Sequence, residues 1–322
     1  MKPGPKKIIS LAILTVLVGC SYSQSTNSGK PWKATVKVID EAGQPVDGAD
    51  VTIGYYVPPP EDETIALGST KGKSDANGFF SASGQTRSVD LLFGAGKDGY
   101  YRSHLDHELG APYQYDPVKW SPEVTLVLRK IGQPIPMYAK REEAKVQKEN
   151  EPVGFDLMAG DWLAPYGKGD RADMLFTVRR KITSEREYEA ELKLTFPNKG
   201  DGIAVAPAEP DTGSDFKTSR IAAEGGYEPE RVWHYSNSSG PESVFGYFFR
   251  VRTVLDENGR VKSCLYGKIR GDFRFYAGTK APRAGMGFDY HLSPTPNDRN
   301  VEFDPKQNLF KSLPFDQQIR EP

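Results

Sequence analysis

The chain has 322 residues and carries 42 lysines and arginines against 43 aspartates and glutamates, for a formal net charge of −1. This balance lacks the excess of basic residues that a nucleic-acid-binding protein shows, so we expect no nucleic-acid partner. The 32 glycines, the 25 prolines and an aromatic content of 11% predict many turns and short strands. The length is sufficient for two domains with hydrophobic cores.

The N-terminal segment has the order of a secretory signal. Lys2, Lys6 and Lys7 precede an apolar run over residues 8–18, and a small residue then precedes Cys20. The apolar run is too short to cross a bilayer, which needs roughly 20 such residues. This length argues against the first alternative, a single membrane anchor. The second alternative is an ordinary signal peptide in which the cysteine is incidental.

The residues at 17–20, Leu-Val-Gly-Cys, resemble the lipobox of a bacterial lipoprotein signal. The resemblance implies that residues 1–19 are removed and that the thiol of Cys20 carries the lipid. It also implies a location in the bacterial cell envelope, anchored through the lipid in a membrane, and Ser21 favours the outer membrane. Residues 20–31 are rich in Ser, Asn, Gln and Gly, and we expect them to form a flexible tether.

Residues 32–130 have the pattern of a small β-sandwich. The β-branched stretches 33–40 and 45–53 flank a turn rich in glycine and proline, which predicts a β-hairpin. The sequence Asp-Ala-Asn-Gly at 75–78 predicts a tight turn that leads into another strand. Residues 123–128 are expected to form the closing strand of this domain.

This pattern resembles the carboxypeptidase regulatory-like domain, which has a transthyretin-like fold. The resemblance implies an accessory or structural module that carries no catalytic residues. No His-Glu-x-x-His motif of a zinc peptidase occurs in the chain, so we do not expect a peptidase. The residues that carry the resemblance are Val38, Asp40, Gly43, Pro45, Val46, Gly48, Ala49, Val51, Ser74, Asp75, Asn77, Gly78 and Phe79.

A cluster of polar residues in this domain has the composition of a metal site. His104, Asp106, His107 and Glu108 lie within five residues, and Asp116 follows. On a helical turn the two imidazoles would share a face, as a pair of metal ligands does. A local cluster usually lacks a remote third ligand, however, so we interpret these residues as polar side chains exposed to solvent and expect no metal and no other cofactor.

Residues 131–152 are expected to form a linker between two domains. Within them the stretch 140–149 is charged on all sides and has no apolar stripe. This composition predicts either a short solvated helix or an extended linker.

Residues 153–316 are expected to form a second, larger antiparallel β-sandwich, followed by a tail over 317–322. Strands are predicted over 173–182 and over 188–196, and in the second stretch apolar and polar residues alternate with period two. The fold class is therefore all-β, with two antiparallel β-sandwich domains in tandem. This half also resembles the C-terminal part of uncharacterised exported bacterial proteins, from which no function follows.

The clearest hairpin joins residues 245–255 to 261–270 through Asn258-Gly259, the preferred sequence of a type I′ turn. Further strands are predicted over 272–276, 286–292 and 301–303.

Candidate chemistry in the second domain is limited to binding. Trp162, Tyr166, Trp233 and Tyr235 are candidate ligand-binding aromatics, because exposed aromatic rings on β-sandwiches can stack on sugars. The alternative is that they pack in the core, where most tryptophans lie.

Three aspartates and a cysteine are weaker candidates for functional residues. Asp201, Asp211 and Asp215 in a glycine-rich region could hold calcium, but their spacing matches no EF-hand. Cys264 lies in a predicted strand with no histidine nearby, which favours a structural thiol. We assign no catalytic residues.

The sequence therefore favours a lipid-anchored cell-envelope protein with a non-catalytic structural or binding role. Its partner would be a polysaccharide or another envelope component, such as a protein. The alternative is an exported hydrolase with its active site in the C-terminal β-sandwich.

Overall fold

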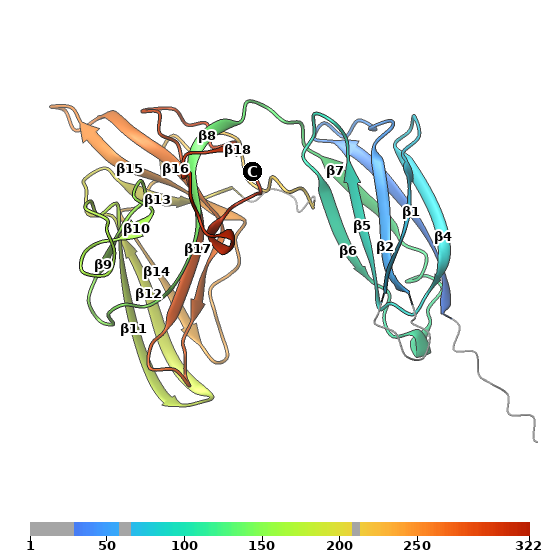
Figure 1. Ribbon diagram of the computed structural model, residues 1–322, viewed down its shortest axis with the longest axis horizontal. Helices are drawn as coiled ribbons and strands as arrows, with labels where there is room; N and C mark the ends of the chain where they lie inside the picture. The colour runs from blue at the N-terminus through green and yellow to red at the C-terminus, as the bar shows by residue number, and fades with distance from the viewer. Residues whose placement is uncertain (1–28, 58–65, 208–212) are drawn as a thin grey trace, which may run out of the picture.

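The computed structural model describes residues 29–57, 66–207 and 213–322 (Figure 1). The signal segment, Cys20 and most of the expected tether lie outside these residues. The described chain is almost entirely β-structure, and its four sheets form two sandwiches that follow one another in the sequence. The predicted fold class is confirmed. No helix in the described part is long and apolar enough to span a membrane.

The first sandwich packs a three-stranded sheet, in the order β4-β1-β7, against a four-stranded sheet, in the order β3-β2-β5-β6. Its core contains Val36, Val38, Ile53, Phe93 and Trp120. The strands are β1 (Lys30–Asp40), β2 (Asp50–Val57), β3 (Ala66–Lys73), β4 (Phe79–Thr86), β5 (Asp90–Gly96), β6 (Ser103–Glu108) and β7 (Glu123–Leu128).

The predicted hairpin between β1 and β2 is wrong, because the two strands belong to opposite sheets. Each strand buries one face, so Val38 on β1 and Ile53 on β2 meet across the core instead of pairing side by side. The connection turns at Asp40, whose carboxylate accepts hydrogen bonds from the amides of Ala42 and Gln44. The same turn residues can connect two paired strands or two strands of opposite sheets. The turn sequence alone therefore did not show that β1 and β2 belong to different sheets.

The tight turn at 75–78 and the closing strand are both confirmed. The Asp75 carboxylate accepts hydrogen bonds from the amides of Asn77 and Phe79, and Gly78 has a φ of 81°. Strand β7 covers the predicted residues and pairs in parallel with β1.

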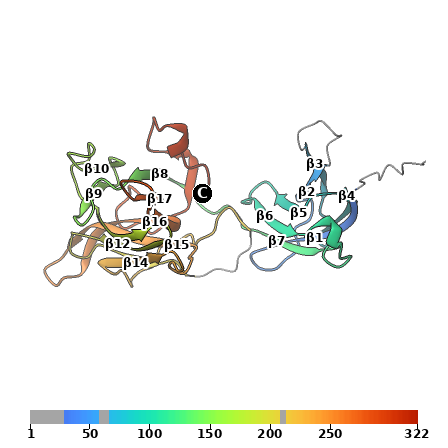
Figure 2. The same ribbon diagram turned by 90° about the horizontal axis from the view of Figure 1, so that it is seen from below.

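The second sandwich packs a five-stranded sheet, in the order β10-β9-β11-β12-β14, against a six-stranded sheet, in the order β13-β15-β16-β17-β8-β18 (Figures 1 and 2). The strands are β8 (Ile135–Lys145), β9 (Val153–Asp156), β10 (Asp161–Trp162), β11 (Met174–Ser184), β12 (Glu187–Thr195), β13 (Gly202–Val205), β14 (Glu230–Ser236), β15 (Gly246–Leu255), β16 (Val261–Tyr276), β17 (Gly285–Leu292) and β18 (Phe303–Asn308). Two 3₁₀ turns, η1 (Pro112–Gln114) and η2 (Phe315–Gln317), are the only helical elements of the described chain.

The segment 131–152 is not a free linker, because it contains strand β8. This strand lies between β17 and β18 in the six-stranded sheet. Its charged side chains are paired: Lys140 Nζ lies 2.7 Å from a Glu142 carboxylate oxygen, and Arg141 forms a salt bridge with Asp289 on β17. The charges that indicated a solvated segment are thus paired within the sheet. The order of polar and apolar residues in the sequence does not reveal such pairs.

The predicted hairpins of the second sandwich form, with one corrected turn. Strand β11 pairs with β12 and β15 pairs with β16, both antiparallel. The β15–β16 turn is not of type I′, because Gly259 has a φ of 75° whereas Asn258 is not among the described residues with positive φ. The Asp256 carboxylate accepts hydrogen bonds from the amides of Asn258 and Arg260, which holds Asn258 in the right-handed region.

The two sandwiches meet at a polar contact that we call the joint, formed by Glu41, Tyr101, Arg129, Phe216, Arg220 and Glu302. The Phe216 ring is fully buried and stacks on the Tyr101 ring, with centroids 5.1 Å apart. Arg129 donates hydrogen bonds to the carbonyl oxygens of Phe216 and Thr218, both at 2.9 Å.

Two glutamates connect the charged groups of the joint. Glu302 accepts hydrogen bonds from the Tyr101 hydroxyl and from the amides of Gly132 and Gln133. Glu41 accepts from both Arg129 and Arg220. Burial alone would raise the pKa of Glu41, but the two guanidinium groups outweigh it and lower the pKa.

Candidate functional site

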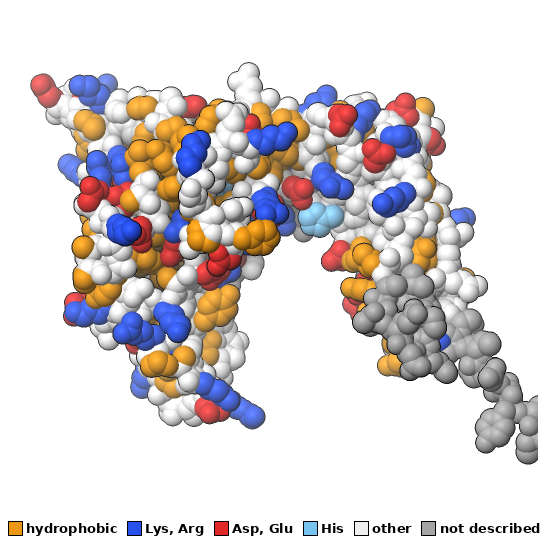
Figure 3. All heavy atoms as spheres, viewed as in Figure 1, with side chains coloured by type: hydrophobic (Ala, Val, Ile, Leu, Met, Phe, Trp, Pro, Cys, Tyr) orange, Lys and Arg blue, Asp and Glu red, His pale blue; other side chains and the backbone are white. Residues whose placement is uncertain are grey.

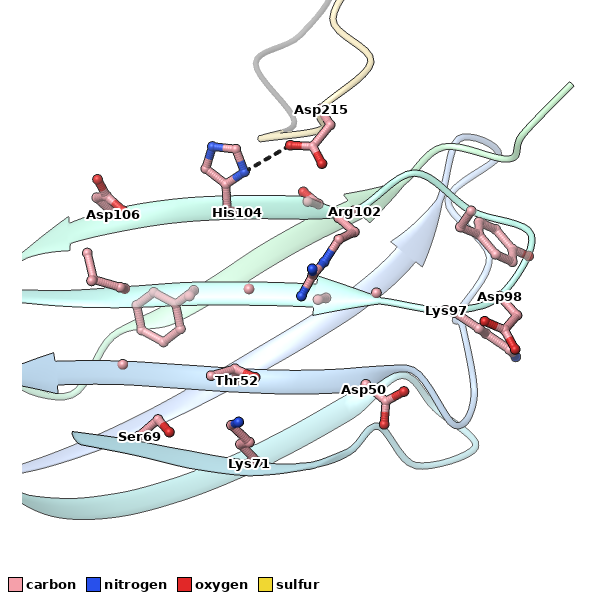
Figure 4. A pocket seen from close by; sticks show the side chains of 18 of the residues that line it. Asp50, Thr52, Ser69, Lys71, Lys97, Asp98, Arg102, His104, Asp106 and Asp215 are labelled. Carbon is pink, nitrogen blue, oxygen red and sulfur yellow. Dashed lines mark ion pairs between the residues drawn. The ribbon is translucent and has the colours of Figure 1, made fainter. Parts of the chain in front are cut away.

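A concave site with a volume of about 950 Å³ lies on the outer face of the β3-β2-β5-β6 sheet. We call it the groove (Figure 4). The inward residues of β2 and β5 are in the core, so the alternate residues face outward into the groove. Its lining includes Thr52, Gly54, Ser69, Lys71, Leu92, Gly94, Gly96, Arg102, His104, Asp106 and Asp215.

Glycines form much of the floor of the groove. In the strand register, Gly54 of β2 lies opposite Leu92 of β5, and Gly94 of β5 lies opposite Thr52. A Cβ added to Gly94 would meet only one atom, the Ser103 carbonyl oxygen at 4.0 Å. A side chain at this position would therefore project into the groove without a clash.

Side chains of both charges line the groove. Lys71, Arg102 and Asp106 have no side-chain hydrogen bond or ion pair with any other described residue. Their donors and acceptors are therefore free for a ligand. His104 differs, because its Nδ1 lies 3.3 Å from an Asp215 carboxylate oxygen, as Figure 4 shows.

Asp215 reaches the groove because the segment 213–215 adds to the edge of β6. The His104 amide donates to the Gly213 carbonyl, and the Asp215 amide donates to the Arg102 carbonyl, each at 2.9 Å. Ser103 and Ser214 form an antiparallel bridge between them. The groove is thus built from both halves of the chain, and β6 lies on the side of the first sandwich that borders the hollow between the sandwiches (Figures 1 and 3).

The two candidate tryptophans are core residues. Trp162 is 6% exposed, and its indole N–H donates to Glu142 Oε1 at 2.9 Å. Trp233 is 4% exposed, and its indole N–H donates to the Tyr247 hydroxyl. Both rings pack edge-on or tilted against other aromatic rings, so neither presents a face to a ligand. Trp162 and Trp233 therefore pack in the core, which is the alternative to ligand binding given for them in the sequence analysis.

The two candidate tyrosines lie apart from each other and from the groove. Tyr166 is 39% exposed, in the loop after β10. Tyr235 is partly buried on β14 and stacks on Phe275 with ring centroids 4.6 Å apart. Burial raises the pKa of Tyr235. The structure does not bring the four candidate aromatics together on one exposed face.

The histidine cluster does not form a metal pair. Residues 103–108 are strand β6 instead of a helical turn, so His104 and His107 lie on opposite faces of the sheet. His104 faces Asp215, whereas His107 Nε2 lies 3.0 Å from the Lys119 carbonyl oxygen. No group of three or more possible metal ligands occurs among the described residues.

The remaining candidates have structural partners. Asp201 accepts hydrogen bonds from the amides of Arg252 and Thr253 and does not line the groove, whereas Asp215 does. Asp211 lies outside the described residues. Cys264 is 2% exposed, and burial raises the pKa of its thiol, as expected for a structural cysteine.

Buried acids do converge in the second sandwich, but on a guanidinium group. Arg252 bonds Asp173 at 2.8 and 2.9 Å and Asp156 at 2.9 Å. Burial alone would raise the pKa of Asp156, but backbone amides and Arg252 outweigh it and lower the pKa. These contacts connect β15 to the opposite sheet. The two aspartates therefore have a structural role, as partners of Arg252.

Sequence reasoning missed the groove because its floor is defined by absent side chains. The local signal is the alternation Phe93-Gly94-Ala95-Gly96, in which every outward position is a glycine. No local signal connects this strand to Asp215, which lies more than a hundred residues further along the chain.

Comparisons with known proteins add little to this description. No protein-family model and no curated protein matches the chain. Among solved structures, 3-chlorocatechol 1,2-dioxygenase from Rhodococcus opacus 1CP is 11% identical over 32% of this chain and 62% of its own, with a TM-score of 0.25. Hydroxyquinol 1,2-dioxygenase from Pseudomonas putida DLL-E4 is 16% identical over 33% of this chain and 58% of its own, with a TM-score of 0.24.

A shaft pilin from Lactobacillus rhamnosus GG is 13% identical over 75% of this chain and 87% of its own, with a TM-score of 0.24. The chain spans less than two thirds of the length of either dioxygenase. Likenesses at this level carry no argument about activity.

Proposed function

We propose that this chain is an exported, lipid-anchored protein of the bacterial cell envelope that binds a polysaccharide in the groove without catalysis. The observation that carries the proposal is the groove itself, an open concave face with a glycine floor and three charged wall residues, Lys71, Arg102 and Asp106, whose side chains have no partner among the described residues. Its volume of about 950 Å³ is near the upper end of the range for ligand sites, roughly 300–1,000 Å³.

The chemistry of the walls supports a polyhydroxylated ligand. Lys71 and Arg102 supply hydrogen-bond donors, and Asp106 supplies acceptors, while Thr52 and Ser69 can do either. Sugar hydroxyls both donate and accept, so they match walls of mixed polarity better than a polymer of one charge does. The backbone of the glycine floor leaves room for rings to approach the sheet closely.

Filling the groove tests the binding proposal. The probe is a set of purified bacterial envelope polysaccharides, presented on an array and then titrated by calorimetry. We expect Gly94→Leu to weaken binding about tenfold or more, because its side chain would occupy the floor. Gly225→Leu is the matched control, since Gly225 is exposed with no atom within 4 Å and lies outside the groove.

Binding that Gly94→Leu leaves unchanged would overturn the assignment of the groove. A chain that binds none of the polysaccharides, or that binds only peptides, would overturn the ligand class.

The anchor is tested separately in cells. Cys20→Ala should move the protein from the membrane fraction to the soluble fraction, because the thiol is the site of lipid attachment. A Cys20→Ala protein that still sediments with membranes would contradict the lipid anchor.

A further inference from the structure

Exposed apolar side chains gather at one end of the first sandwich, which we call the N-terminal pole. Tyr113 and Val118 are 86% and 80% exposed, the highest values for large apolar side chains in the described chain. The set consists of Tyr56, Leu67, Val89, Tyr113, Tyr115 and Val118.

The strand register places these residues at the same end as the beginning of β1. Lys30 pairs with Thr86, and the Thr86 hydroxyl donates to the Tyr56 carbonyl. Tyr56 lies opposite Leu67 in the β2–β3 ladder. The Lys33 amide donates to the Trp120 carbonyl, so the segment that contains η1 lies beside the same end (Figure 1).

The most exposed part of the pole is held in place by contacts beneath it. The Tyr115 ring packs on the buried Trp120 ring, with centroids 5.3 Å apart. The Asp116 carboxylate accepts a hydrogen bond from the Val118 amide, and the Asp116 carbonyl accepts one from the Trp120 amide. Tyr113 and Val118 therefore project from an ordered segment, which limits the entropy lost on binding.

We propose that the N-terminal pole docks onto the surface of the lipid bilayer in which the chain is anchored. This inference rests on the proposed lipid attachment at Cys20. Nine residues separate Cys20 from Lys30, and they reach about 35 Å at full extension, at roughly 3.3–3.6 Å per residue. The pole is thus the part of the described protein that the anchor holds nearest to the membrane.

The chemistry of the pole suits the region between lipid headgroups and acyl chains. Tyrosines are enriched there, because the ring is apolar and the hydroxyl stays hydrated. Lys30 and Lys119 are exposed at the same end and can contact phosphate groups. A lipid on a flexible tether fixes the point of attachment but not the orientation of the domain, so added protein contacts would contribute to that orientation.

Fluorescence from a new tryptophan tests the docking. The four natural tryptophans are buried, so Tyr113→Trp adds the only exposed indole of the described chain. The protein with residues 20–322 is coupled through Cys20 to a maleimide lipid in phosphatidylcholine–phosphatidylglycerol vesicles with brominated acyl chains. Cys264 is buried and stays unreacted. The reporter should lose roughly half of its added fluorescence relative to vesicles without bromine.

Phe315→Trp is the matched control, because Phe315 is 76% exposed but lies in η2 of the second half (red coil near the centre of Figure 1). It should show little bromine quenching. Val118→Glu in the Tyr113→Trp protein should reduce the quenching at Tyr113→Trp.

Absence of quenching at Tyr113→Trp, or equal quenching of both reporters, would overturn the proposal. A pole that instead mediates a concentration-dependent dimer without vesicles would overturn it too. Because the lipid is attached chemically, these outcomes do not depend on whether Cys20→Ala changes fractionation in cells.

Discussion

Lys268 is a buried cation beside the joint, and its replacement should stabilise the protein. The residue lies on β16, is 1% exposed, and places Nζ 4.7 Å from the centroid of the Phe216 ring. Burial lowers the pKa of Lys268 from 10.5 to about 7, and the positive charges of Arg270 and Arg129 act in the same direction. The negative charge of Glu302 opposes them.

The size of the effect follows from this pKa. At about 1.4 kcal/mol per pKa unit, the drop corresponds to as much as roughly 5 kcal/mol of unfavourable free energy at neutral pH. The cation–π contact with Phe216 offsets about 2 kcal/mol of it. Lys268→Met keeps the length of the side chain and removes the charge, so it should raise the free energy of unfolding by up to about 3 kcal/mol.

The gain should depend on pH with a definite sign. Below about pH 7 the amine is protonated in both states, and between about pH 7 and 10 the unfolded chain binds more protons than the folded one. The wild-type protein therefore gains stability across this window through Lys268, and Lys268→Met does not. The advantage of the variant should be largest at low pH and should shrink as pH rises.

Urea unfolding followed by circular dichroism, at about pH 6.5, 8 and 9.5, measures this difference. Comparing the two proteins at each pH cancels the contributions of the other titrating groups. The reasoning is refuted if Lys268→Met is less stable than the wild type, or if its advantage does not change with pH.

Three further predictions concern other parts of the structure and are checked by the same unfolding measurement. Glu302→Gln should lower stability by about 1–3 kcal/mol, because its carboxylate accepts three hydrogen bonds in the joint, and an unchanged unfolding midpoint would contradict this. Arg252→Met should lower it by about 3–5 kcal/mol by leaving two buried aspartates without their guanidinium partner, whereas a smaller loss than for Glu302→Gln would show that the acids become neutral at little cost. Gly78→Ala should be more destabilising than Gly43→Ala, since both glycines have a left-handed φ but only Gly78 approaches the Val38 carbonyl, and equal losses would show that backbone strain alone decides.

The strands that bury one face were predictable from sequence because burial imposes a period of two. In β12, Ala190, Leu192 and Leu194 are buried, whereas Glu191 and Lys193 between them are only half-buried. Strand β8 was missed because its lysine–glutamate pair is buried, and residue polarity alone predicts exposure. Whether the charged residues of β8 are buried depends on their partners in the sheet, and some of these, such as Asp289, lie far away in the sequence.

The candidate site was not predictable by the same reasoning. The predicted ligand contacts were aromatic rings, but the tertiary fold places Trp162 and Trp233 in the core. The groove depends on glycines at outward positions and on Asp215, which reaches β6 only through the folded path of the segment 213–215. The alternating glycines of β5 are a local signal for the floor, but no local pattern connects that strand to Asp215.

Because residues 213–215 pair with β6, the first sandwich depends on a segment of the second half of the chain, which limits its transfer to other proteins as a separate domain. A gene fragment that ends near residue 130 would leave the β6 edge unprotected, and it would remove the Phe216 and Thr218 carbonyls that Arg129 reaches. The first sandwich is therefore not an interchangeable cassette, although its chain is continuous. Evolutionary shuffling would have to move both halves together or rebuild that edge, and a fusion designed around the first sandwich should include a replacement strand.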